Sequence, residues 1–234
     1  MTAGRSTHPS PSFFAPPRPP PNSNKLIRLP QALSNCTKLK DLNVGCNKIK
    51  TLPNTDAWVE MEELKCHQNG IIMLPSFASM VCLRFLKMDR NRALGELPEF
   101  GENLAVLEHL EVNNCYLSSL PKSINTLKSL ATLNCQNNQL ESLPFELVLP
   151  KLSLLNCSSN PKLKALPVTL GQCESLRICF FGDTAIAAFP EGFGALSKLE
   201  RVLVPKNLGL EDAPDFSQAS ATASDNKGWV KAVF

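Results

Sequence analysis

Cysteine and histidine are the residue types in this chain best suited to chemistry. The 234 residues include nine cysteines and three histidines, His8, His67 and His109. No two cysteines have CxxC spacing, so the sequence does not predict a zinc site. The cysteines are odd in number and scattered, which favours a reducing compartment over the paired disulfides of a secreted protein.

Cys46 and His67 form the one pair with a spacing suited to nucleophilic chemistry, because a thiol beside an imidazole can be activated by it. No third group that would orient the imidazole can be named from the sequence. Asp89 and Glu111 are a second pair of candidate groups, because they occupy neighbouring units of a sequence repeat. Two carboxylates on an exposed sheet are usually solvated. Phosphate-binding, GxSxG, HExxH and kinase motifs are absent from the sequence. We therefore predict that the chain is not an enzyme and uses no metal or cofactor.

Two periodic markers run through the chain in phase. Proline recurs at steps of 22 to 24 residues, and an asparagine or a substitute for it recurs with the same period. The proline positions are Pro30, Pro53, Pro75, Pro98, Pro121, Pro144, Pro167, Pro190 and Pro214. The asparagine positions are Asn24, Asn47, Asn69, Asn91, Cys115, Asn138, Asn160, Thr184 and Asn207.

An apolar triplet precedes each asparagine position in the pattern LxxLxLxxN, as in Leu39, Leu42 and Val44. Its last two members alternate with polar residues, which predicts a short strand buried on one side. The asparagine amide is expected to bind backbone groups where the chain leaves the strand, and Cys115 and Thr184 can replace it only in part. Proline cannot pair in a sheet, so it is expected on the opposite, convex side, where segments such as Lys122 to Lys128 should form short helical turns.

These repeats resemble the leucine-rich-repeat family over about residues 24 to 210. The 23-residue LPxxLxxL form is similar to the intracellular class that includes plant Ras-group-related and adenylate-cyclase-type scaffolds. The resemblance implies an α/β solenoid, a leucine-rich-repeat arc with a parallel concave sheet and short helical or 3₁₀ convex segments. It also implies a protein-interaction module rather than a catalyst.

The repeats divide the chain into three parts: a proline-rich arm at 1–22, a solenoid at 23–210 with a half repeat and about eight repeats, and a tail at 211–234. Because the array begins in mid-repeat, either Phe13 and Phe14 cover its first layer or the true start of the protein is missing. The final segment from Trp229 to Phe234 either caps the last layer, which we favour, or binds a partner.

Composition argues against several partners. The excess of Lys and Arg over Asp and Glu gives a net charge of only +3 and is spread along the chain, so nucleic acid is not indicated. No apolar stretch reaches the roughly 18 residues of a membrane span, and no signal-peptide core precedes the repeats. We predict a cytoplasmic protein. The prolines of the arm offer an SH3-type contact, although a solvated tail is the favoured interpretation.

Each repeat is numbered from the first Leu of its apolar triplet, so that Leu39 is position one of the first repeat. Strand alternation predicts that the side chains at positions three, five, seven and eight of each repeat face outward on the concave sheet. We expect a charged patch in repeats two to four and an apolar patch in repeats seven and eight, with Leu154, Ile178, Phe180 and Leu203 exposed. Such apolar groups mark either an interface or a surface covered by the carboxy-terminal tail. The predicted partner-binding residues are Lys65, His67, Phe85, Lys87, Asp89, Arg90, His109, Glu111, Asn113, Asn134, Ile178, Phe180 and Leu203.

Phe85, Arg90 and Phe180 are the expected anchors, because aromatic and arginine side chains dominate binding energies. The charged residues beside them would supply specificity. The sequence thus predicts a module or signalling scaffold that binds a protein partner on its concave face. The alternatives are a structural subunit of a large assembly and a recognition domain of a larger receptor.

Overall fold

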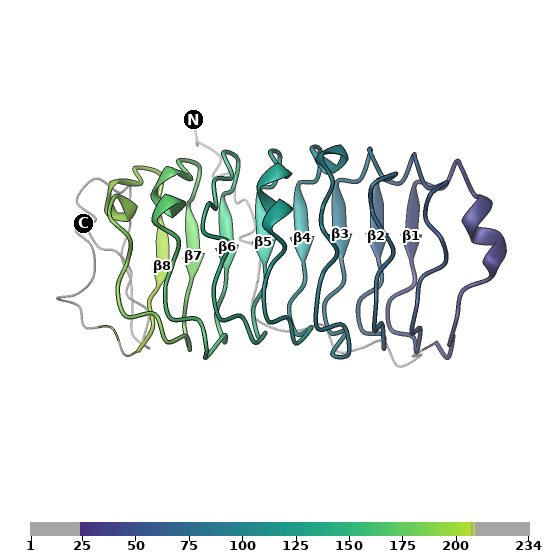
Figure 1. Ribbon diagram of the computed structural model, residues 1–234, viewed down its shortest axis with the longest axis horizontal. Coiled ribbons are helices and arrows are strands. Elements are labelled where there is room, and N and C mark those ends of the chain that lie inside the picture. The colour runs from purple at the N-terminus through teal and green to yellow at the C-terminus, as the bar shows by residue number, and fades with distance from the viewer. Residues whose placement is uncertain (1–23, 207, 209–234) are drawn as a thin grey trace, which may run out of the picture.

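One short strand per repeat builds a single parallel sheet. The computed structural model describes residues 24–206 and 208. In it, eight strands lie side by side in chain order along the molecule (Figure 1). They are β1 (Asp41–Asn43), β2 (Glu63–Lys65), β3 (Phe85–Lys87), β4 (His109–Glu111), β5 (Thr132–Asn134), β6 (Leu154–Asn156), β7 (Ile178–Phe180) and β8 (Arg201–Leu203).

The strands pair without any slip of register. Leu42 lies opposite Leu64, and Leu64 lies opposite Leu86, so the central residue of every strand falls in one column. The rest of this column is Leu110, Leu133, Leu155, Cys179 and Val202. The register follows from the repeat, because each turn returns the same pattern position to the same height. The predicted leucine-rich-repeat solenoid with a parallel sheet is confirmed.

The helices of the described residues are five 3₁₀ turns, one before β1 and four in segments between strands. They are η1 (Gln31–Asn35), η2 (Glu102–Leu104), η3 (Lys122–Thr126), η4 (Val168–Gln172) and η5 (Phe193–Ala195). Pro30, Pro121 and Pro167 directly precede η1, η3 and η4 with φ between −58° and −65°. Proline fixes this angle and needs no hydrogen-bond partner, so it suits a turn start. The short helical turn predicted at Lys122 to Lys128 is confirmed by η3.

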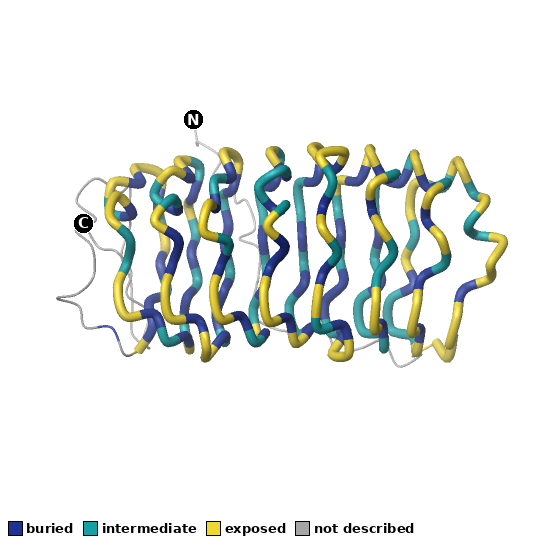
Figure 2. Tube along the Cα trace, viewed as in Figure 1, coloured by how far each residue is buried: buried dark blue, intermediate teal, exposed yellow. Residues whose placement is uncertain are grey.

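The core is a stack of apolar layers between the sheet and the convex segments. Buried and exposed stretches alternate along every turn of the chain (Figure 2). Trp58, Phe77 and Phe100 fill successive layers on the side away from the strands and are fully buried. Trp58 Nε1 also donates to the carbonyl oxygen of Leu33 at 2.8 Å, which ties η1 to the first full repeat.

Most cysteines act as small apolar side chains, as predicted. Cys135 and Cys157 occupy equivalent buried positions in successive repeats, with their Sγ atoms 3.4 Å apart, and Cys179 is buried at the centre of β7. Burial raises the pKa of Cys66 to about 12 and of Cys115 to about 11. These thiols therefore stay protonated and packed at neutral pH.

The asparagine positions form the hydrogen-bonded ladder that the sequence predicts. The buried amide of Asn91 donates to the carbonyl oxygens of Cys66 and Met88 and accepts from the N–H of Ile71. Asn69, Asn138 and Asn160 make equivalent contacts with their own neighbouring repeats. Each amide thus satisfies backbone groups of two adjacent turns.

The two substitutes serve fewer groups, as expected. Cys115 Sγ donates to the Met88 carbonyl at 3.3 Å, and Thr184 Oγ1 donates to the Phe181 carbonyl at 2.7 Å. The repeat before Cys115 also has a different turn, in which the N–H of Gly95, at φ +71°, reaches the Cys115 carbonyl at 3.1 Å. The longer spacing from Asn91 to Cys115 is accommodated there.

The residue before the asparagine position has a left-handed backbone in the seven repeats from Asn47 to Thr184. The φ angles lie between +51° and +60° at these seven positions. They are Cys46, Gln68, Arg90, Asn114, Asn137, Ser159 and Asp183. Position eight therefore lies in the turn out of the strand rather than in the flat sheet where the sequence placed it. Only asparagine and aspartate adopt this conformation readily without glycine, so the other four positions carry some strain.

Candidate protein-binding face

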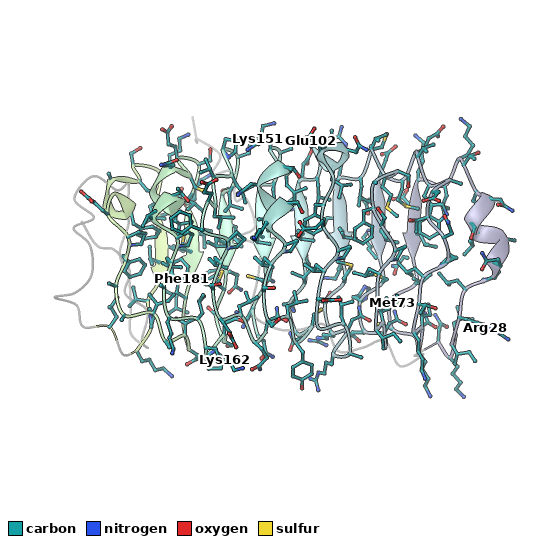
Figure 3. All side chains as sticks on the ribbon, in the orientation of Figure 1. Arg28, Met73, Glu102, Lys151, Lys162 and Phe181 are labelled. Atoms are coloured by element: carbon teal, nitrogen blue, oxygen red, sulfur yellow. The ribbon has the colours of Figure 1, made fainter. Side chains whose placement is uncertain are left out.

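The outward side chains of the eight strands form one continuous surface, which we call the sheet face. It comprises positions three and five of each repeat, with position seven just beyond the strand ends. Most of its side chains are half-buried by neighbours in the adjacent strands. Charged side chains of the turns lie along the margins of the solenoid instead, with Glu102 and Lys151 at one margin and Lys162 at the other (Figure 3).

Repeats two to four hold a cluster of aromatic and charged groups, as predicted. Lys65 Nζ lies 5.3 Å from the centre of the Phe85 ring, and the His109 ring lies 5.6 Å beyond it. Lys87 pairs with Glu111 from β4 and lies 3.2 Å from Asp89. These contacts join β2, β3 and β4. We call the residues that make them the charged patch: Lys65, Phe85, Lys87, Asp89, His109 and Glu111.

Internal pairing fixes the charge states in the charged patch. Burial lowers the pKa of Lys87, but its hydrogen bond to Glu111 and the negative charges of Glu111 and Asp89 outweigh burial, so the Lys87 pKa is raised. Lys65 is likewise paired with Glu63 on its own strand. The charges compensate one another, and a partner would meet an almost neutral, shaped surface rather than a strong field.

Asp89 differs from its prediction as a solvated carboxylate. It is buried, with 7% of its surface exposed, and its Oδ2 lies 3.9 Å from Arg90 Nε. Position seven falls where the sheet meets the turn, so the neighbouring repeats cover it. Asp89 therefore positions Lys87 and Arg90 more than it contacts a partner.

The middle of the sheet face is built from amides. Asn134 Oδ1 accepts the N–H of Gln136 at 3.2 Å, and Asn156 Oδ1 accepts the N–H of Ser158 at 3.1 Å. Asn156 also donates to the Gln136 side chain at 3.2 Å. Asn113, at position seven of the fourth repeat, is half-buried. These side chains hold the ends of the strands, so only part of their hydrogen-bonding capacity faces outward.

Repeats seven and eight present an apolar group, which we call the apolar patch: Ile178, Phe180 and Leu203, all half-buried on β7 and β8. Gly182 makes room for it, because a Cβ at that position would lie 2.7 Å from Leu203 Cδ2. Arg201, exposed, stands beside Ile178 in register. Leu154 was predicted to belong to this patch, but it is buried, with 9% of its surface exposed.

The sequence missed one feature of the face, the packing of His67. Gly45 at position seven of the first repeat leaves a gap that the His67 imidazole fills, because a Cβ on Gly45 would lie 2.1 Å from His67 Cε1. Burial lowers the pKa of His67, while the charge of Asp89 acts in the opposite direction. The available indication was Gly45 at position seven of one repeat, followed by His67 at the same position of the next.

Other kinds of site find no support in the described ranges. Among residues 24–206 and 208, no three His, Cys, Asp or Glu side chains gather so that they could hold a metal ion. No helix in the same residues is long and apolar enough to cross a membrane. The proline-rich arm, Phe13, Phe14 and the segment from Trp229 to Phe234 lie outside them, so the predicted SH3-type contact and the two cap hypotheses stay predictions.

Solved structures with this fold cover most of the chain. A leucine-rich-repeat protein of Leptospira interrogans superposes with a TM-score of 0.59 at 23% identity, over 82% of this chain and 55% of that one. The functional domain of InlJ of Listeria monocytogenes, described as including a cysteine ladder, superposes with a TM-score of 0.65 at 22% identity, over 80% of this chain and 39% of that one. No family model matches the sequence. The chain thus has the leucine-rich-repeat fold.

The curated relatives are much longer proteins. The chain is 29% identical over 205 residues to the Arabidopsis thaliana protein SUPPRESSOR OF npr1-1, CONSTITUTIVE 1, which covers 86% of this chain and 14% of that protein. It is also 29% identical over 163 residues to the TMV resistance protein N of Nicotiana glutinosa, over 64% and 14%. The chain thus spans about one seventh of these relatives. Their resemblance lies in the repeats.

Proposed function

We propose that this chain is a protein-interaction module that binds a protein partner on its sheet face, without turnover. The observation that carries the proposal is the composition of that face. It combines a charged patch, a central amide stretch and an apolar patch on one rigid, in-register sheet, while most other apolar side chains are packed inside. Aromatic and charged groups held on a preformed surface are typical of binding sites.

The partner-binding residues of the proposal are those that the sequence predicted, with Phe85, Arg90 and Phe180 as anchors. Phe85 supports this role, because its ring is held between Lys65 and His109 and is half-buried before any partner binds. A side chain already ordered loses little entropy on binding. Asp89 serves the face indirectly, through its ion pair with Lys87.

Affinity capture with a matched pair of variants tests the proposal. Phe85→Ala/Arg90→Ala alters the sheet face, whereas Phe145→Ala/Lys122→Ala removes an exposed phenylalanine and an exposed lysine from the convex side. We expect the sheet-face variant to lose partners by at least about tenfold, since two anchors together contribute a few kcal/mol. The convex variant should retain them with the same thermal midpoint. Equal capture by both variants would refute the proposed face.

A structural subunit of a large assembly is the second candidate, and a recognition domain of a larger receptor is the third. The share of the curated relatives that the chain covers favours the third, because there such repeats are one part of a longer protein. Size-exclusion chromatography of native extracts separates the first two, since a permanent subunit would elute almost wholly in a large particle. The free cysteines of the described residues favour a reducing compartment, so we place the module in the cytoplasm.

A further inference from the structure

Cys46 and His67 lie side by side just beyond the ends of β1 and β2. The Sγ atom of Cys46 is 3.8 Å from Nε2 of His67, a distance at which sulfur forms weak hydrogen bonds. Both residues are half-buried, in contrast to the fully packed cysteines of the core. A thiol in contact with an imidazole can pass its proton to that ring.

The His67 imidazole occupies the space that a side chain at Gly45 would fill. Because any Cβ at Gly45 would clash with the ring, the His67 imidazole rests on the backbone of the first repeat. The contact is between neighbouring repeats, and the strands on both sides are paired in register. The ring therefore stays beside Cys46 instead of swinging into solvent.

Asp89 supplies a group that can orient the ring. If Nε2 of His67 accepts the thiol proton, Nδ1 must carry the other hydrogen. Nδ1 of His67 is buried and lacks a hydrogen-bond partner, and Asp89 occupies position seven of the next repeat, where its negative charge acts on the ring. Oδ1 of Asp89 already forms an ion pair with Lys87 Nζ at 3.2 Å. Asp89 therefore acts on the His67 ring through its charge.

Gln68 is the other neighbour of the thiol. Its side-chain oxygen lies 3.4 Å from Cys46 Sγ and can accept a hydrogen bond from the thiol. An amide is not a base, however, so it can hold the S–H group but cannot remove the proton. His67 is the neighbour that can do so.

We infer that Cys46 is a modification site, a thiol that His67 deprotonates and that hydrogen peroxide oxidises to a sulfenic acid, with Asp89 as the residue that positions His67. In this step the sulfur forms a bond to one peroxide oxygen and the O–O bond breaks. The departing hydroxide takes the proton held by His67 and leaves as water. One thiol and one peroxide thus give one sulfenic acid and one water. This inference does not depend on the proposed partner binding.

Two other cysteines are natural controls within the same chain. Cys82 is exposed, and Cys36 is half-buried with its thiol 3.7 Å from the Ala32 carbonyl oxygen. His109 lies in β4 against Phe85, so neither of these thiols shares the arrangement of Cys46. The six remaining cysteines are buried.

The test is the rate of peroxide oxidation at each thiol of the full chain. Sulfenic acid is trapped with a cyclic 1,3-diketone, and labelling at positions 36, 46 and 82 is followed by peptide mass spectrometry. We expect Cys46 to react about tenfold or more faster than Cys82, as base assistance allows. His67→Gln should lower the Cys46 rate to that of Cys82, and Lys128→Gln, at an exposed position of the convex side, should leave it unchanged. A Cys46 rate equal to that of Cys82 in the natural chain, or unchanged by His67→Gln, would overturn the inference.

A pH profile of the unmodified sequence decides the matter even if His67→Gln fails to fold. The charged groups that act on His67 are Asp89, Glu111, Lys87 and Arg90, and burial prevails so that the His67 pKa is lowered. Because the pKa of His67 is lowered from the ordinary histidine value of about 6.5, the ring is still mostly unprotonated, and so able to accept a proton, at about pH 6.5. Alkylation of Cys46 by iodoacetamide should fall less than about threefold between about pH 7.5 and 6.5, whereas a thiol without a neighbouring base slows about tenfold over that range as its thiolate is lost. Cys82 is the reference thiol in the same sample. Parallel tenfold losses would contradict His67 assistance.

Discussion

At the scale of single residues, the asparagine ladder stabilises the solenoid by satisfying backbone groups that water cannot reach. Asn91 is the clearest case, because its fully buried amide bonds three backbone groups from two adjacent repeats. Removing such an amide deletes the hydrogen bonds and also leaves their partners buried and unpaired.

Asn91→Ala is therefore expected to lower the free energy of unfolding by about 3 kcal/mol or more, since three backbone groups lose their partner. Chemical denaturation followed by circular dichroism measures the change. Asn113→Ala is the control, because Asn113 is a half-buried residue of the sheet face outside the ladder and should cost under about 1 kcal/mol. Equal losses in the two variants would show that the ladder is not a special source of stability.

The sequence predicted the ladder and the core from residue types alone, because both depend on positions repeated in every turn. It did not predict the burial of Asp89 or the seat of His67 on Gly45. Those features depend on the sizes of unlike side chains in neighbouring repeats, which a periodic pattern does not encode. Leu154 was misplaced for the same reason, since its neighbours in β5 and β7 cover it.

At the scale of the repeat, the turn after each strand determines how the next segment leaves the sheet. Its left-handed residue recurs in seven repeats, and four of them carry side chains that do not favour this conformation. These residues were predicted to lie in the sheet because the sheet was expected to extend to position eight of each repeat. The strand ends earlier, at position five, as in β1 ending at Asn43.

Ser159 tests the turn. With φ at +56°, Ser159→Val should destabilise the protein by about 1–2 kcal/mol, because a β-branched side chain clashes in the left-handed region, whereas Ser159→Gly should be close to neutral. Thermal unfolding of both variants measures the difference. Thr132→Val, a comparable change on β5, is the control and should have little effect. If Ser159→Val is as stable as Ser159→Gly, the turn conformation is not a constraint.

At the scale of the whole molecule, the strict register of the sheet turns the order of repeats into a map of the binding face. The charged patch and the apolar patch lie on β2–β4 and β7–β8, with the amide stretch between them. A partner that touched both patches would have to extend along the sheet. The fold was predictable from the repeat period, whereas the identity of the partner was not, because outward positions are the ones that the core leaves unconstrained.

Site-specific photo-crosslinking is the most direct test that the sheet face binds a protein. Benzoylphenylalanine placed at Asn134, the last residue of β5, reports on the sheet face, and the same group at Phe145, exposed on the convex side, reports on the opposite side. Illumination of cells that contain each variant is followed by mass spectrometry of the crosslinked products. We predict a discrete partner crosslinked through position 134 and not through position 145. The same partner crosslinked only through position 145 would contradict the proposed function.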